Sequence, residues 1–332
     1  MASLTPSSTA TCDRTRVVKE ITDFLSCSRV PEVPADITPL EFYRQFVAAS
    51  CPCIIRAGHS GAGIFDHWRA RQYWLDDSYL LDTCKDLTVT VNYTPDGHGD
   101  CVRNGLFVKP EERQVSFPEV WRQLTKYEGN DDCDVGVPYC SIQNDCLRQE
   151  FQPLANDIDV TGIALANEAL RAELEAVNIW VGDERSVSSV HSDPFENFYC
   201  VIRGSKKVCL LPPTDAPYLG EGQFRAATYY QPNPGDTFEV KLDDDGSTVP
   251  WYEVDPLYPD LNKNPEFANA SPVTVDVHAG DLLYIPSLWL HRVSHNRCIG
   301  PSIAVNFWYA MRFGPSYVAT MLRRELAGMD AK

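Results

Sequence analysis

The stretch SSVHSDPFENFYCVIRGSKKVCLLPP, residues 188–213, contains two apolar runs rich in aromatic and β-branched residues. Between the runs stands RGSK (203–206), whose glycine is typical of a tight turn, so the stretch predicts two strands joined as a β-hairpin. The first run opens with His191 and Asp193. Because alternate residues of a strand project from the same face, we expect this imidazole and this carboxylate to point the same way.

A histidine about a hundred residues further on completes a candidate metal site. The segment AGDLLYIPSLWLHRVSH (279–295) predicts a turn, a buried strand and then His291. A His-x-Asp pair with a distant His is the ligand set of 2-His-1-carboxylate sites, which leave open positions on Fe(II). The triplet alone also fits an ordinary surface pair. His278, before the turn, and His295, expected past the rim, compete with His291 for the third ligand position, and we favour His291.

Further polar residues could complete a pocket around such a metal. Lys206 follows the predicted turn and could pair with a carboxylate, although it could also be an ordinary turn lysine. In SIAVNFWYAM (302–311), Asn306 and Trp308 share one face of a strand. An asparagine in an apolar strand must find partners if it is buried. Neutral hydrogen-bonding groups could come from Tyr139, Ser188 and Asn197.

The rest of the chain predicts a mostly β protein with surrounding helices. Short strands broken by Pro and Gly follow one another from Val137, which suggests a sandwich or barrel. We expect an N-terminal helix and strand region over residues 1–130 that packs on the core, a β catalytic domain over 131–312, and a C-terminal helix over 313–332. In the first region, Ser116 and Glu119 have the spacing of a capping box. A long excursion, about 214–270, contains the acidic segment KLDDDGS and is expected to be a substrate-facing loop.

Composition narrows the class of protein. The 332 residues carry a formal net charge of −17, which argues against nucleic acid as a partner and suits a basic protein segment, although it also serves solubility. The twelve cysteines include no C-x-x-C pair, so no disulfide or zinc framework is expected. No signal peptide and no membrane-spanning apolar run is visible. We expect a cytoplasmic protein that does not bind membranes, with the nucleus as an additional location.

Three segments resemble a known family. HSDPFENFYCVIRGSKKVCLLPP, AGDLLYIPSLWLHRV and IAVNFWY are similar to segments of the JmjC-domain 2-oxoglutarate oxygenases, and the resemblance covers about residues 40–312. It implies a double-stranded β-helix, that is, a cupin-like jelly roll. It also implies Fe(II), 2-oxoglutarate and O₂ as cofactor and co-substrates, with ascorbate supporting activity.

The resemblance assigns roles to individual residues. It implies that His191, Asp193 and His291 are the iron ligands and that Lys206 pairs with the far carboxylate of 2-oxoglutarate. The remaining pocket residues that it implies are Tyr139, Ser188, Asn197, Tyr199, Asn306 and Trp308.

The same resemblance implies hydroxylation of a protein side chain by a member of the small hydroxylase branch. A lysine in a basic segment of a GTP-binding protein of the developmentally regulated class is the implied target, and a homodimer is common in this branch. Three alternatives remain. They are N-methyl-lysine demethylation, protease activity, and a cupin-like binding protein without catalysis. No Ser/His/Asp arrangement supports a protease, and the complete triad with Lys206 and Asn306 argues against a non-catalytic protein.

Overall fold

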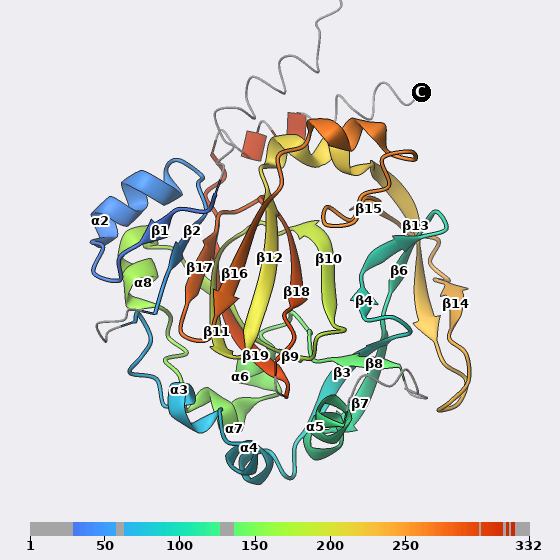
Figure 1. Cartoon of the computed structure of the whole chain (residues 1–332), viewed down its shortest axis with the longest axis horizontal. Helices are drawn as coiled ribbons and strands as arrows, with labels where there is room; N and C mark the ends of the chain where they lie inside the picture. Colours follow the sequence, from blue (N-terminus) through green and yellow to red (C-terminus); the bar gives the residue numbers. More distant parts are fainter. Residues whose placement is uncertain are drawn as a thin grey trace, which may run out of the picture.

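Two β-sheets face each other at the centre of the molecule in the computed structural model (Figure 1). The structure describes residues 29–57, 63–126, 136–298, 300–314, 317–318 and 320–322. In spatial order, the six strands of the first sheet are β1 (Glu32–Val33), β2 (Cys53–Ile55), β17 (Leu282–Ile285), β11 (Phe195–Arg203), β19 (Ser302–Ala310) and β9 (Leu174–Gly182). The five strands of the second are β16 (Val273–His278), β12 (Ser205–Leu211), β18 (Leu290–His295), β10 (Val187–Ser192) and β4 (His98–Gly99).

Side-chain alternation along the strands fills the space between the two sheets. On β11, Tyr199 and Val201 point inward and pack against Val208 of β12 and Val293 of β18 in the opposite sheet. Phe198 and its alternate neighbours face the other way, into a separate apolar cluster outside the first sheet. This two-residue period is what a strand buried on both faces requires. The arrangement confirms the predicted jelly roll.

The predicted hairpin at RGSK is wrong in its pairing. β11 pairs with β17 and β19, whereas β12 pairs with β16 and β18, so the turn carries the chain from one sheet to the other. His191 and Asp193 also do not open β11, because a separate strand, β10, ends at Ser192 before Pro194. Proline has no N–H to donate to a ladder, which explains the break.

Helices cover the outer face of the six-stranded sheet (Figure 1). The short elements in chain order are α2 (Pro39–Phe42), the π-helical turn η1 (Tyr43–Val47), α3 (Ala70–Tyr73), α4 (Asp77–Thr83), α5 (Phe117–Thr125), α6 (Cys146–Gln149), α7 (Gln152–Ala155) and α8 (Ala164–Leu170). Ser116 is the N-cap of α5, but its side chain makes no capping hydrogen bond. The capping box predicted there is absent because Glu119 binds Arg122 and Gln123 instead.

The long excursion after β12 is folded rather than a loop. It begins with a 3-10 helix, η2 (Pro213–Leu219), and ends with another, η3 (Pro265–Asn269), which pack on the outer face of the five-stranded sheet. Between them lie β13 (Glu221–Tyr230), β14 (Glu239–Leu242) and β15 (Thr248–Tyr252). These strands form a third sheet with β6 (Leu106–Lys109) and β5 (Cys101–Arg103). The sequence analysis expected a loop here and missed this sheet, in which β13 pairs with β6, more than a hundred residues earlier in the chain.

A fourth, small sheet and a few further observations complete the description. Its strands are β7 (Glu111–Ser116), β3 (Thr88–Thr94) and β8 (Val137–Tyr139).

The nine cysteines in the described part of the chain are all free. Within the same residues, no helix combines the length and the apolar character needed to cross a membrane. Most of the predicted C-terminal helix lies outside the described residues.

Candidate metal centre

The pairing of β10 with β18 brings the predicted metal ligands together. His191 lies directly opposite His291 in this antiparallel ladder, and Ser188 lies opposite Val293. These two pairs are three residues apart on β10 but only two residues apart on β18, so a bulge lies between Ser188 and His191. Strict alternation would place Ser188 and His191 on opposite faces, and the bulge turns both toward the interior.

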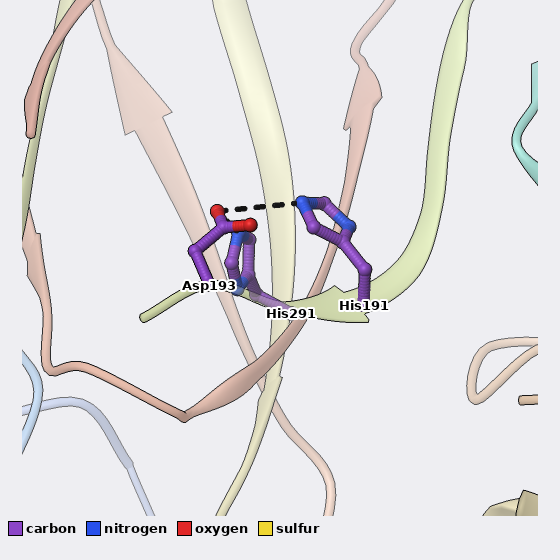
Figure 2. Close-up of side chains that lie close together, drawn as sticks. All are labelled: His191, Asp193 and His291. Carbon is purple, nitrogen blue, oxygen red and sulfur yellow. Dashed lines mark ion pairs between the residues drawn. The ribbon is translucent and has the colours of Figure 1, made fainter. Parts of the chain in front are cut away.

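His191, Asp193 and His291 form a compact donor set (Figure 2). One ligand atom from each lies within 4.8 Å of the others. Asp193 Oδ2 is 3.6 Å from Nε2 of His191 and 3.5 Å from Nε2 of His291. Two ligands at right angles, each about 2.1 Å from one metal ion, lie roughly 3 Å apart. Small side-chain adjustments therefore suffice for these residues to hold a single ion from one side.

Backbone carbonyls fix the orientation of both imidazoles. His191 donates its Nδ1–H to the carbonyl of Ser189 at 2.7 Å, and His291 donates to the carbonyl of Trp289 at 3.0 Å. Such bonds leave Nε2 as the free lone pair, which is the form that binds a metal. Burial and the neighbouring His291 lower the pKa of His191, so its ring is neutral. Burial alone would raise the pKa of Asp193, but the two imidazoles hold it below its usual value.

Lys206 lies fully buried on β12, next to Tyr139, which lines one cavity with the metal ligands. Its Nζ donates to Nε2 of His295 at 2.7 Å and lies 5.8 Å from the centre of the Tyr139 ring. Burial lowers the pKa of Lys206 well below its usual value. Among the described residues, no carboxylate forms an ion pair with Lys206, so no directly paired protein anion stabilises the charged form of this buried amine.

His295 is not past the rim, as the sequence suggested, but is buried in β18. Burial and the charge of Lys206 lower its pKa well below the usual value, so the neutral ring can accept the hydrogen bond from Lys206. Its Nδ1 lies 2.8 Å from Oγ of Ser302. A signal for this placement was present, because His291, Val293 and His295 alternate along one strand. His278, in contrast, lies exposed at the end of β16, as expected.

The other predicted pocket residues line one cavity with the metal ligands. They are Tyr139, Ser188, Asn197, Tyr199, Asn306 and Trp308. Trp180, which the sequence analysis did not single out, donates to Asn306 at 2.9 Å, and Asn306 donates to Asn197 at 3.1 Å. The asparagine in the apolar strand thus has the partners that burial demands.

Several buried polar atoms around this cavity have no hydrogen-bond partner among the described residues. They are the Tyr199 hydroxyl, Trp308 Nε1 and Asp193 Oδ2. Burial raises the pKa of Tyr139 and of Tyr199, so both phenols remain neutral donors. A metal ion would satisfy the carboxylate, and a small anion would satisfy the donors and Lys206. The residues present therefore fit Fe(II) and a dicarboxylate co-substrate.

Gly182 is required where β9 passes His295 and Tyr139. A Cβ at this position would lie 2.7 Å from Cε1 of His295 and 2.8 Å from Cδ2 of Tyr139. Any side chain would displace the groups that surround Lys206. The glycine that ends AVNIWVG is therefore a packing requirement of the cavity.

A wider cleft of about 310 Å³ adjoins the metal ligands on the side of the third sheet. It shares His191 and Asp193 with the inner cavity and extends to Asp100, Phe107 and Trp251. The Trp251 ring is parallel to that of His191, with an interplanar angle of 3° and ring centres 6.3 Å apart. Sequence patterns gave no sign of these outer residues, because β4, β6 and β15 meet only in the tertiary fold.

A jelly-roll interior with two histidines, one carboxylate and a buried lysine that has no carboxylate partner among the described residues defines the class of Fe(II)- and 2-oxoglutarate-dependent oxygenases. The family model of the cupin-like domain matches residues 39–315. This chain belongs to that family and, within it, to the JmjC oxygenases, as its relatives show.

Three relatives are similar over most of their length. JmjC domain-containing protein E of Dictyostelium discoideum is 35% identical, covering 93% of this chain and 92% of that protein. The human bifunctional peptidase and (3S)-lysyl hydroxylase JMJD7 is 37% identical, covering 87% and 86%. The lysine-specific demethylase JMJ32 of Arabidopsis thaliana is 34% identical, covering 90% and 87%. The resemblance stated from sequence motifs is thereby confirmed.

Proposed function

We propose that this protein hydroxylates a lysine side chain in a basic segment of a protein substrate. The observation that carries the proposal is the complete donor set of His191, Asp193 and His291 together with the buried amine of Lys206. The similarity to a (3S)-lysyl hydroxylase over 87% of the chain supports lysine as the target. A GTP-binding protein of the developmentally regulated class is the first substrate to test.

Each part of the site would have a separate task. His191, Asp193 and His291 would hold Fe(II) by one face, leaving the opposite positions free. Lys206 would bind the far carboxylate of 2-oxoglutarate, with the neutral phenols of Tyr139 and Tyr199 as further donors. The bound iron would use O₂ to convert one C–H bond and 2-oxoglutarate into C–OH, succinate and CO₂.

The walls of the cavity would protect this chemistry. Trp180, Trp308 and Val293 line it and keep bulk water away from the reacting centre. The hydrogen bonds from Trp180 to Asn306 and from Asn306 to Asn197 hold the polar side chains in place while the co-substrate enters and leaves. The substrate lysine would approach from the outer cleft, which adjoins His191.

Demethylation of N-methyl-lysine is the second candidate, since a lysine-specific demethylase is also similar over 90% of the chain. Both activities oxidise a carbon of a lysine side chain. They differ in the carbon that faces the metal, which is near the backbone in hydroxylation and beyond the side-chain nitrogen in demethylation.

Mass spectrometry of peptides separates these functions. Lysine-bearing peptides, with and without N-methyl groups, are incubated with the protein, Fe(II), 2-oxoglutarate and ascorbate. We expect the gain of one oxygen on lysine, located by fragmentation, and no gain with the His291→Ala protein. Loss of a methyl group with release of formaldehyde would replace the proposal by demethylation. Chain cleavage that persists without 2-oxoglutarate would replace it by peptidase activity.

A further inference from the structure

Asp100 stands out among the residues of the outer cleft. Besides the metal ligand Asp193, it is the only carboxylate that lines this cleft in the described part of the chain. It lies between β4 and β5 with a backbone φ of 50°, a left-handed conformation that aspartate adopts more readily than most residues. No hydrogen bond or ion pair joins its carboxylate to another described residue. Burial raises the pKa of this carboxyl to about 6.

A lysine in the same cleft does not neutralise Asp100. The Nζ of Lys109 lies 2.8 Å from Oδ2 of Asp243, which also accepts a hydrogen bond from Thr228. Lys109 is close enough to lower the pKa of Asp100 somewhat, but burial outweighs that effect. The cleft therefore offers a partly desolvated carboxylate, and the lysine that acts on it electrostatically is already paired with Asp243. Such a group costs stability unless an incoming cation pairs with it.

An aromatic wall connects the metal centre with the outer part of the cleft. Trp251 lies parallel to the ring of His191, and the ring centre of Phe107 is 4.6 Å from that of Trp251. All three residues line the cleft. An apolar wall beside an unpaired carboxylate matches the side chain of lysine, which has a methylene stem and a cationic end.

Strand register places Asp100 at a suitable distance from the metal ligands. Gly99, the residue before Asp100, pairs in parallel with Ser188, which lies three residues before His191. Because of the bulge, this step on β10 matches two residues of β18, which span about 7 Å. Four bonds of about 1.5 Å separate Cβ of a lysine from its Nζ, which is roughly 5 Å in an extended chain. A lysine whose ammonium lies near Asp100 can thus present a carbon close to its backbone to the metal.

We infer that Asp100 binds the ε-ammonium group of the substrate lysine and selects the carbon that is oxidised. The inference rests on the proposed lysyl hydroxylation. With the ammonium held away from the metal ligands, hydroxylation near the backbone is favoured and oxidation of an N-methyl group is disfavoured. Asp100 is therefore a residue that determines both the substrate and the position of attack.

The test compares two peptides that differ only at the target position, one with lysine and one with norleucine, which lacks the ammonium group. Binding of both is measured by calorimetry on full-length protein loaded with Mn(II) and 2-oxoglutarate, and product formation is measured with Fe(II). We expect the preference for lysine to fall roughly 10- to 100-fold in Asp100→Asn, the loss of one charge-assisted contact. Asparagine tolerates the left-handed backbone, so the fold should be kept.

Glu112→Gln is the matched control, because Glu112 is an exposed acid that acts on Asp100 electrostatically but does not line the cleft. It should leave the preference unchanged, and Asp100→Glu should retain much of it. An equal loss in Glu112→Gln, or an unchanged preference in Asp100→Asn, would overturn the inference.

The binding and product measurements also separate this inference from the proposed function. If wild-type protein hydroxylates lysine and Asp100→Asn keeps the wild-type preference for lysine over norleucine, the proposed function is sustained and the role of Asp100 is rejected. Lysine binding that depends on Asp100, without any gain of oxygen on lysine, would sustain the subsite and reject the function. Wild-type protein that neither binds nor oxidises lysine peptides would reject both.

Discussion

The inner and outer ends of the active-site region are built in different ways. At the inner end, Lys206, His295 and Tyr139 are buried and come from strands around the jelly-roll interior. At the outer end, Asp100 and Trp251 come from segments outside the two central sheets and line an open cleft. A closed end of this kind suits a small invariant co-substrate, whereas an open end suits a side chain that belongs to a larger protein.

The largest effect is expected for the metal ligands that separate the two ends. Alanine at His191, Asp193 or His291 removes one of three donors, so iron affinity should fall by roughly 100-fold or more and turnover should be lost with it. Iron content and succinate formation measure the two effects. His278→Ala is the control, because His278 is exposed on β16. Stoichiometric iron in His291→Ala with loss in His278→Ala would show that the third ligand is misassigned.

Lys206→Ala tests the closed end by itself. The co-substrate would lose its buried cation, so its affinity should fall by roughly 100- to 1,000-fold while iron stays bound. Titration of 2-oxoglutarate against succinate formation measures this. Lys207→Ala is the matched control, since the adjacent residue pairs with Asp276 at a half-exposed position. An unchanged half-saturation concentration in Lys206→Ala would exclude Lys206 from this role.

The pH dependence of co-substrate binding should separate the two ends further. Burial lowers the pKa of Lys206 in the free protein, and a bound carboxylate would raise it. Binding then takes up a proton between these two pKa values, so 2-oxoglutarate affinity should fall by up to about tenfold per pH unit as pH rises through that window. Calorimetry in buffers of different ionisation enthalpy measures the uptake. A net release of protons when 2-oxoglutarate binds would contradict this account.

The difference between the inner and outer ends also explains which parts of the site could be predicted from the sequence. His191 and Asp193 share a face by strand period alone, and Asn306 stands out as a polar residue in an apolar run. The bulge that turns Ser188 inward could not be derived, because it depends on the register with β18. The pairing of β11 and β12 with different sheets was likewise invisible, since a glycine turn fits both a hairpin and a crossing between sheets.

The outer cleft shows the limit of local patterns more sharply. Asp100 approaches β10 through two paired residues of β4, and Trp251 arrives in a strand that pairs with β13. These contacts join segments about ninety and sixty residues from His191 in the chain, so periodicity around either residue carries no information about them. Only the tertiary register assembles the end of the site that meets the substrate.

His295→Ala should have a moderate effect at the closed end. Loss of the hydrogen bond to Lys206 leaves one of the three ammonium donors without a protein partner, which should raise the half-saturation concentration of 2-oxoglutarate by roughly 3- to 10-fold. Iron content should stay unchanged because His295 is not in the donor set. His295→Gln, which retains an acceptor, should recover part of the affinity. Loss of iron in His295→Ala would instead point to a role as a ligand.

The smallest effect is expected at the outer end, in the acidic hairpin between β14 and β15. Asp243 binds Lys109, so Asp243→Asn would free this lysine to compete with the substrate for Asp100. A half-exposed pair of this kind is worth at most about 1 kcal/mol, so lysine-peptide affinity should fall roughly 2- to 5-fold, measured by calorimetry. Asp244→Asn, in the same hairpin but exposed, is the control. Equal losses in both variants, abolished by salt, would indicate attraction by the acidic surface as a whole, because screening acts over roughly 8 Å. A loss confined to Asp243→Asn would show that the hairpin acts on the substrate through Lys109 and the cleft.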